Sequence, residues 1–268
     1  DLHSFPTRRS SDLVLIAVDI GATKTLLALF SDNGRVLRRF KFPTNDNFPT
    51  FLKNLSTNLK PFTSFKIKAI AVAIPGLVYN NYSVEFGNRN WGKIDLFTPI
   101  KKLFNCPIIL DNDASLASLY EGSNLPGLVI FLTFSTGLGG GVIKNNQLLP
   151  ASSTFEPGHR FYTFNGQTEE WEDIASASAI GKAYQVKHAT SLRGKTIMQD
   201  IATRISLGLP DIIQEFNPDI IIFGGPLGKI FNLYSPYLPS IPNVQFKRPR
   251  RPSDSVIYGC YLLAKTQA

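Results

Sequence analysis

The sequence predicts an α/β protein built from two related halves. The first observation is an apolar run over residues 13–18 that ends in a polar turn, residues 19–24, and is followed by a second apolar run, residues 25–30. The second is a repeat of this plan, because the apolar run 128–134 ends in a glycine-rich turn over residues 135–141. Strand-like and helix-like segments alternate through the rest of the chain. Two such halves are expected to face each other across a ligand-binding cleft.

Each copy of the plan continues into a further hairpin. In the first copy a turn over residues 32–34 leads to a third strand, 35–40, and in the second an Asn-Asn turn leads to a short strand, 148–149. Neither copy fits the G-x-x-x-x-G-K-S/T loop or a Rossmann fingerprint, because no helix with the required spacing follows the glycines. The pattern therefore predicts phosphate chemistry of a different architecture.

The first turn, residues 19–24, carries the parts of a phosphate site. Gly21 lets the backbone approach an anion closely, and Thr23 and the turn amides can donate hydrogen bonds to it. Asp19 can face a hydrated Mg²⁺, and Lys24 adds a positive charge. A β-hairpin with a polar turn explains the same residues, so this turn alone leaves both interpretations open.

The second turn, residues 135–141, holds four glycines in seven positions, Gly137 and Gly139 among them. Little side chain then separates the backbone amides from a bound anion, and the Thr136 hydroxyl adds a donor. We expect both turns to bind the phosphate groups of a nucleotide.

Two further strands are expected in the first half. The run 66–74 reads as a strand that stops at Pro75-Gly76, and the run 107–110 reads as another that ends in Asp111-Asn112-Asp113. A short helix, residues 114–121, follows directly. Asp113 is therefore expected at or near its N-cap.

The second half is expected to contain a long helical region over residues 197–216, interrupted near Gly208-Leu209-Pro210. It leads into a strand, residues 219–223, which ends in Gly224 and Gly225. A planar base could lie against the bare backbone of such a turn. A Gly-Gly turn after a buried strand is also common without any ligand.

Composition limits the classes of function. The chain of 268 residues is 43% hydrophobic and 18% charged, enough for two lobes or one large domain. No apolar run approaches the roughly 18 residues of a membrane span, and no signal peptide is visible. Two cysteines without a pairing pattern predict reduced thiols and a cytoplasmic location. The net charge of +8 includes a basic cluster, residues 247–251, which is more typical of a solvated loop than of a nucleic-acid site.

The first residues look foreign to the rest of the chain. Residues 1–13 resemble a translated sequencing adapter and have neither helical nor strand periodicity, so they are excluded from fold reasoning. We expect the true start codon to be missing. The predicted lobes are residues 14–112 and 113–268, with the last helix a candidate to return to the first lobe.

Six short matches in order resemble the ROK family (repressors, open reading frames, kinases), whose kinases have the actin-like ATPase fold. The resemblance runs from about Val14 to the C-terminus, and the matches are residues 19–24, 112–114, 135–141, 156–159, 171–176 and 224–225. It implies a two-lobed actin-like ATPase (ribonuclease H-like) fold, each lobe a mixed sheet flanked by helices. It also implies an ATP-dependent sugar kinase that uses Mg²⁺.

The resemblance assigns roles to the residues of the N-D-A segment. Asp113 becomes the general base for a sugar hydroxyl, and Asn112 becomes a residue that orients sugar hydroxyls. Phosphoryl transfer needs positioning, charge neutralisation and a carboxylate that can accept a proton. A role of Asp113 as a helix cap alone stays open as the alternative.

By the same resemblance Glu156, His159 and Glu172 ring the far side of the sugar, where carboxylates and an imidazole satisfy alternating hydroxyl donors and acceptors. Asn88 and Trp91 are candidates to close the pocket, although core packing explains Trp91 equally well.

One departure from the family stands out. Many members carry a C-x-C-G-x-x-G-C-x-E zinc segment between the histidine, itself a ligand, and the last glutamate. Residues 160–171 contain no cysteine, and structural zinc needs four ligands, so the sequence predicts no zinc site. The wall of the sugar pocket is then expected to depend on packing of Phe161, Phe164 and Trp171, and the sequence does not determine the orientation of His159.

Three functions from different classes are compatible with these features. The favoured one is a kinase that phosphorylates a primary hydroxyl of a glucose-like hexose, with an N-acylated hexosamine as the second substrate and polyphosphate as an alternative donor. A repressor of the same family would need an N-terminal helix-turn-helix region. The third is a non-catalytic sugar or nucleotide sensor. The expected partners are a sugar and a nucleotide, without nucleic acid or membrane, and a homodimer is left open.

Overall fold

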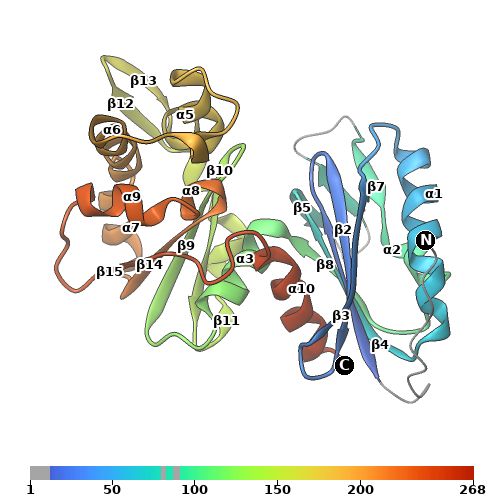
Figure 1. The fold of residues 1–268 in the computed structure, drawn as a ribbon. Helices are drawn as coiled ribbons and strands as arrows, with labels where there is room; N and C mark the ends of the chain where they lie inside the picture. The colour runs from blue at the N-terminus through green and yellow to red at the C-terminus, as the bar shows by residue number, and fades with distance from the viewer. Residues whose placement is uncertain (1–12, 80–82, 87–90) are drawn as a thin grey trace. The chain divides into compact units, whose positions relative to one another are not determined.

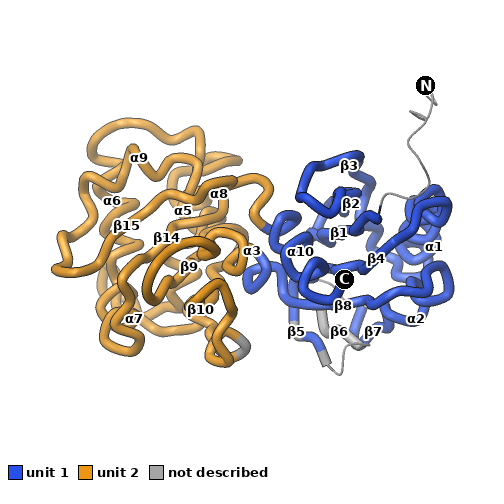
Figure 2. Tube along the Cα trace, turned by 90° about the horizontal axis from the view of Figure 1, so that it is seen from below, with its two compact units in different colours: residues 1–116, 256–268 blue, residues 117–255 orange. Residues whose placement is uncertain are grey.

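A computed structural model describes residues 13–79, 83–86 and 91–268. The chain divides into two compact units, and each contains a five-stranded sheet with helices (Figures 1 and 2). Unit 1 comprises residues 1–116 and 256–268, and unit 2 comprises residues 117–255. The last helix, α10 (Ser255–Thr266), thus lies almost entirely in unit 1.

The sheet of unit 1 is mixed and has the order β3-β2-β1-β4-β8. An antiparallel meander forms its first part, and two parallel pairings, β1 with β4 and β4 with β8, form the rest. Its strands are β1 (Val14–Ile20), β2 (Lys24–Ser31), β3 (Val36–Pro43), β4 (Ile67–Ile74) and β8 (Ile108–Asn112). Their ends lie within three residues of the predicted ones, because the apolar runs were bounded by turn residues.

Alternate residues of β1 pack on opposite faces of this sheet. Ile16 and Val18 belong to a core cluster that contains residues of α1 (Phe48–Leu59), whereas Leu15 and Ala17 pack in the cluster that contains Ile257 and Cys260 of α10. Side chains of a strand point alternately to its two faces, so a strand that is apolar at every position needs cover on both. Cover by α1 on one face and by α10 on the other explains why residues 14–18 of β1 are all apolar.

Several elements of unit 1 were not predicted. Beyond Ile74 the chain continues into a separate three-stranded sheet, β5 (Gly76–Tyr79), β6 (Ser83–Phe86) and β7 (Lys93–Asp95). The unassigned helices are α1, whose N-cap Asn47 accepts a hydrogen bond from the Thr50 N–H at 3.0 Å, the 3₁₀ turn η1 (Lys60–Ser64), and α2 (Phe97–Lys101).

The sheet of unit 2 repeats the plan of unit 1. An antiparallel hairpin, β9 with β10, is followed by parallel pairings of β9 with β14 and of β14 with β15. The order is β11-β10-β9-β14-β15, and the strands are β9 (Leu128–Phe134), β10 (Leu138–Lys144), β11 (Gln147–Leu148), β14 (Ile220–Gly224) and β15 (Gln245–Lys247).

The helices of unit 2 bury a second core, in which Trp171 and Tyr234 have no exposed surface. The predicted interruption near residue 208 separates α6 (Lys195–Ser206) from α7 (Leu209–Phe216). Short elements complete the unit: α4 (Trp171–Ala175), α5 (Ala177–Ala183), α8 (Gly225–Gly228), α9 (Phe231–Tyr234), the hairpin β12 (Phe161–Phe164) and β13 (Gln167–Glu170), and the 3₁₀ turns η2 (Pro150–Thr154), η3 (Pro157–His159), η4 (Ala189–Ser191) and η5 (Ser235–Tyr237). Among the described helices none is long and apolar enough to cross a membrane.

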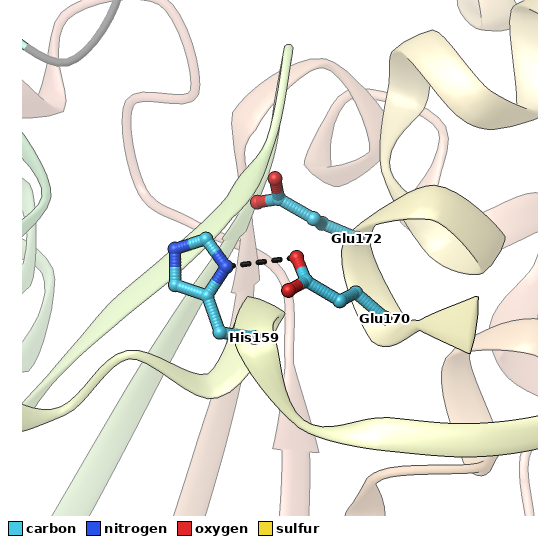
Figure 3. Close-up of side chains that lie close together, drawn as sticks. All are labelled: His159, Glu170 and Glu172. Atoms are coloured by element: carbon cyan, nitrogen blue, oxygen red, sulfur yellow. Dashed lines mark hydrogen bonds and ion pairs between the residues drawn. The ribbon is translucent and has the colours of Figure 1, made fainter. Parts of the chain in front are cut away.

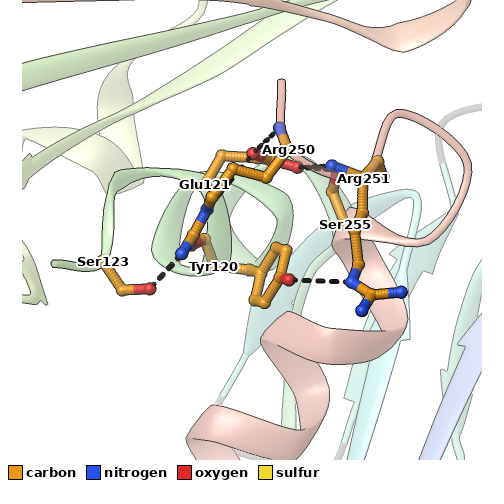
Figure 4. A network of polar contacts seen from close by, with 6 residues as sticks. All are labelled: Tyr120, Glu121, Ser123, Arg250, Arg251 and Ser255. Carbon is orange, nitrogen blue, oxygen red and sulfur yellow. Dashed lines mark hydrogen bonds and ion pairs between the residues drawn. The ribbon is translucent and has the colours of Figure 1, made fainter. Parts of the chain in front are cut away.

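A buried carboxylate anchors the basic segment that precedes α10 (Figure 4). Glu121, at the end of α3 (Asp113–Gly122), is fully buried and accepts hydrogen bonds from the Arg250 and Arg251 N–H groups, at 2.6 and 3.0 Å, and from the Ser255 hydroxyl, at 2.6 Å. The Arg250 guanidinium lies 4.4 Å from the Tyr120 ring centroid. The basic cluster of the sequence therefore contains residues that hold the fold together.

Candidate active site

Four acidic or amide side chains gather at one edge of the unit 1 sheet. The parallel register aligns Asp19 of β1 with Ala73 of β4, and Ala73 with Asp111 of β8. Asn112 ends β8 and Asp113 begins α3. Because parallel strands end at the same edge, residues nearly a hundred positions apart in the sequence are brought together there.

The electrostatics of this edge favour a bound cation. Burial, followed by the charge of the neighbouring Asp113 carboxylate, raises the pKa of Asp19 to about 7, against the opposing charges of Lys41 and Arg39 on β3. Burial also raises the pKa of Asp111 against the hydrogen bond that its carboxylate accepts from the Asn112 N–H at 2.7 Å. Carboxylates that are costly to ionise are stabilised by a divalent cation, and carboxylate oxygen is the ligand that Mg²⁺ prefers. The donor set at this edge therefore fits a hydrated Mg²⁺.

The cap of α3 is Asn112. Its side-chain oxygen accepts hydrogen bonds from the Ala114 N–H at 2.8 Å and from the Ser115 N–H at 3.1 Å, the pattern of an N-cap residue. Its amide nitrogen donates to the Gly76 carbonyl at 3.2 Å. Asp113 is the first helical residue, and its carboxylate accepts a hydrogen bond from the adjacent Ala114 N–H at 2.7 Å. Asp113 therefore lies next to the N-cap, near which it was expected, and Asn112 itself caps α3.

The first turn joins β1 and β2. The Gly21 N–H donates to the Lys24 carbonyl at 3.2 Å, and a Cβ on Gly21 would come within 3.0 Å of the same oxygen. Thr23 and Lys24 are exposed. The turn is a tight hairpin, as one interpretation held, and its exposed hydroxyl and ammonium groups are available to an anion as the other requires.

The second turn is shorter than its glycines suggested. It covers residues 135–137, closed by a 2.8 Å hydrogen bond from the Ser135 N–H to the Gly137 carbonyl, whereas Gly139 and the two glycines that follow lie in β10. A Cβ on Gly140 would come within 2.6 Å of the Phe131 carbonyl, so packing explains that glycine. Thr136 is exposed at the turn.

A cavity of about 160 Å³ lies beside the second turn. Its lining residues come from that turn, from α5, from the segment 187–190 and from the start of α8: Ser135, Thr136, Ala177, Ser178, Lys187, His188, Ala189, Thr190 and Pro226. Gly224 and Gly225 precede Pro226. A Cβ on Gly224 would come within 2.2 Å of the Phe131 ring, and Gly225 has a φ of +68°. These two glycines therefore allow the β14–α8 turn to pack beside the cavity.

His159, a predicted sugar-binding residue of unit 2, lies close to Glu172, also predicted, and to Glu170 (Figure 3). His159 Nδ1 lies 2.9 Å from Glu170 Oε2, and ligand atoms of His159, Glu170 and Glu172 all lie within 4.8 Å of one another. The hydrogen bond with Glu170 is the main cause that raises the pKa of His159 above its usual value, and the charges of Glu172 and Glu156 add to it. Glu156 is exposed.

Glu172 also joins this cluster to the second turn. Its Oε2 accepts a hydrogen bond from the Leu138 N–H at 3.1 Å, and a Cβ on Gly137 would come within 2.6 Å of the same oxygen. Gly158 is equally constrained, because a Cβ there would come within 2.4 Å of the Leu138 carbonyl. Two of the predicted motifs are therefore in direct contact within unit 2.

A model of the ROK family matches residues 15–257. The chain belongs to the ROK family. It is 27% identical over 240 residues to a xylose repressor of Bacillus spizizenii, covering 77% of this chain and 62% of that protein, so it spans less than two thirds of that relative. It is 30% identical over 189 residues to an N-acetylmannosamine kinase of Shigella boydii, covering 65% of each chain.

The fold has a counterpart among solved structures of the family. A ROK glucokinase from Streptomyces griseus, solved in complex with glucose and AMPPNP, superposes with a TM-score of 0.76 at 20% identity, over 94% of this chain and 99% of that chain. The predicted two-lobed actin-like ATPase fold, with a mixed sheet and flanking helices in each lobe, is confirmed.

The aromatic wall of this ROK chain differs from expectation. Phe161 is 65% exposed, so its predicted packing role is wrong. Trp171 is fully buried and donates from Nε1 to the Arg204 carbonyl at 3.0 Å, and the Arg204 guanidinium lies 4.5 Å from the Phe164 ring centroid. β12 alternates between solvent and core, which places Phe161 outward and Tyr162 against Trp171.

The two candidates for closing the pocket have different outcomes. Asn88 lies outside the described residues. Trp91 packs on Phe51 and Phe48, with ring centroids 4.9 and 5.3 Å apart, and donates to the Asp46 carbonyl. These contacts are those of the core-packing alternative.

Sequence reasoning missed Glu170 and the segment 187–190. Glu170 belongs to a run of acidic residues without periodicity. The available signal was its position: it stands two residues before Glu172, and the zinc segment of the family has its last cysteine two residues before the corresponding glutamate. The segment 187–190 carries no motif, so only the fold reveals that Lys187 and His188 line the cavity beside the second turn.

Proposed function

We propose that this ROK chain is an ATP-dependent sugar kinase that phosphorylates a primary hydroxyl of a hexose. The supporting observation is the edge of the unit 1 sheet, where Asp113 stands next to Asp19 while Asn112 caps the helix. A carboxylate that the helix does not require, beside a second carboxylate suited to a cation, is the arrangement that phosphoryl transfer needs.

In this proposal Asp113 accepts the proton of the attacking hydroxyl. Asp19 would hold Mg²⁺, and the bound ion would neutralise charge on the transferred phosphoryl group. Lys24 and the amides of the first turn bind phosphate oxygens, and the second turn, with Thr136 and Gly137, binds the nucleotide beside the cavity. The transferred group then moves between oxygens that the protein holds in line.

Glu156, His159 and Glu172 are proposed to bind the sugar hydroxyls. One oxygen of Glu172 is occupied by the Leu138 N–H, which leaves the other oxygen as an acceptor for a hydroxyl and links sugar position to the second turn. A glucose-like hexose is the first candidate. The similarity to N-acetylmannosamine kinases supports an N-acylated hexosamine as the second.

A sugar-responsive transcriptional regulator is the second candidate function. The similarity to xylose repressors favours it, because that relative is matched over 77% of this chain. Such a protein would bind a sugar through the same unit 2 residues without turnover. Binding and turnover measured separately therefore distinguish the two functions.

The test is a panel of sugars that includes glucose, mannose, fructose, xylose, N-acetylglucosamine and N-acetylmannosamine, with ATP or polyphosphate and Mg²⁺. ADP or sugar phosphate formation reports turnover, and calorimetry reports binding. A kinase releases ADP only with its cognate sugar. Saturable binding of a sugar without product at any donor would support the regulator and contradict the kinase.

A further inference from the structure

The β12–β13 hairpin places a carboxylate against the imidazole of His159. Glu170, the last residue of β13, pairs in register with Phe161, and the Trp171 N–H donates to the Arg160 carbonyl at 2.7 Å. The hydrogen bonds between β12 and β13 therefore hold the backbone of Glu170 beside residues 160–161, which directly follow His159. Its carboxylate then reaches His159 Nδ1 at 2.9 Å (Figure 3).

This contact determines what the imidazole can present. A carboxylate accepts from Nδ1–H, so Nε2 is left to meet a further group, either as an acceptor or, in the protonated ring, as a donor. Glu172 and Glu156 also lie near enough for their charges to act on the ring. The His159 side chain is 59% exposed, and Glu170 is its ion-pair partner among the described residues, so this contact restrains the orientation of the ring.

We propose that Glu170 is a positioning residue that holds His159 in one orientation and directs Nε2 to a sugar hydroxyl without a metal ion. This inference rests on the proposed sugar site. Position 170 corresponds to the last cysteine of the zinc segment, since it stands two residues before Glu172. A direct carboxylate–imidazole hydrogen bond replaces thiolate–metal–imidazole bridging, and the antiparallel ladder replaces the metal as the link between the two chain segments.

Glu169 offers a matched control on the same hairpin. It pairs with Tyr162 one position earlier in β13 and is exposed, so its side chain leaves the opposite face of the strand. Glu169→Gln removes the same charge from the same hairpin without touching His159. Glu170→Gln keeps an acceptor for Nδ1–H, and Glu170→Ala removes it.

The first measurement is the imidazole titration of His159 by NMR in the full chain, with its signal assigned through His159→Gln. We expect a pKa above the usual histidine value in the wild type and in Glu169→Gln, a lower pKa in Glu170→Gln, and a further fall in Glu170→Ala. An unchanged titration in Glu170→Ala would overturn the proposal. This readout does not depend on turnover, so it stands even if the kinase assignment fails.

The second measurement separates binding from chemistry. In Glu170→Ala the sugar KM or Kd should rise about tenfold, the equivalent of one lost hydrogen bond, while kcat changes by less than about threefold and ATP affinity is retained. Glu170→Gln should recover part of the loss. An equal loss of sugar affinity in all variants, Glu169→Gln included, would contradict positioning by Glu170.

The metal content of the purified protein decides between the carboxylate and an ion. The proposal expects no stoichiometric zinc and no change of the His159 signal on chelation. One bound zinc per chain, lost together with the His159 orientation on chelation, would show that the three side chains of Figure 3 act as metal ligands and would overturn the proposal.

Discussion

Replacement of Asp19 by asparagine should stabilise the protein at neutral and alkaline pH. The carboxylate is largely buried at the end of β1 and lies near Asp113, and both causes raise its pKa to about 7. A group whose folded pKa lies above its unfolded value of about 4 favours the folded state only while it is protonated. Ionisation of Asp19 therefore lowers the free energy of unfolding as pH rises from about 4 to about 7.

The magnitude follows from the shift of the pKa. About three pKa units correspond to about 4 kcal/mol at most, because one unit is worth about 1.4 kcal/mol. About 2–3 kcal/mol of this should appear between about pH 5 and about pH 8. An asparagine keeps the shape without the charge, so the variant should lack this part of the pH dependence.

The assay is urea denaturation of both proteins at several pH values, without nucleotide or divalent cation. Asp32→Asn is the control, because Asp32 is exposed and its pKa is lowered by Lys68 at 2.8 Å, so this change should give no gain at high pH. The reasoning is refuted if Asp19→Asn shows the same decline of stability with pH as the wild type. Added Mg²⁺ should stabilise the wild type more than the variant.

Two further predictions concern unit 2. Glu121→Gln keeps the volume of a fully buried side chain but removes the charge that accepts hydrogen bonds from three donors in the segment 250–255. The change should lower the free energy of unfolding by about 2–4 kcal/mol and Tm by roughly 5–15 °C. A Tm within about a degree of the wild type would show that the network contributes nothing to stability. Gly225→Ala should destabilise unit 2 by at least about 2 kcal/mol in the same denaturation assay. The reason is that φ of Gly225 is +68° and that the new Cβ would come within 2.5 Å of the Phe134 carbonyl. A variant as stable as the wild type, with unchanged nucleotide affinity, would show that the β14–α8 turn does not need glycine there.

The strands around both turns were predictable because their chemistry is local. Apolar runs bounded by polar or glycine residues locate β1, β2, β9 and β14 without tertiary information. The strands β5 to β7 and the hairpin β12–β13 are only three or four residues long, and each pairs with a strand adjacent to it in the sequence. Runs this short do not show the alternation by which a strand is recognised from sequence.

The details of the site could not be predicted from residue types alone. Asn and Asp cap helices about equally well, so the sequence did not decide that Asn112 caps α3 and that Asp113 follows it. The glycines of β10 have the composition of a phosphate-binding turn, but Gly140 is a glycine because a Cβ there would collide with the Phe131 carbonyl. Glu170 required the strand register before its contact with His159 became visible.

Turnover of Asp113→Asn tests the central claim most directly. With the cognate sugar, ATP and Mg²⁺, coupled ADP release should fall about 10²–10⁴-fold in kcat, the usual contribution of a positioned general base. The melting temperature and the sugar affinity should remain close to those of the wild type, because Asn112 caps the helix in both proteins. A wild-type kcat in the folded Asp113→Asn variant would contradict the proposed mechanism.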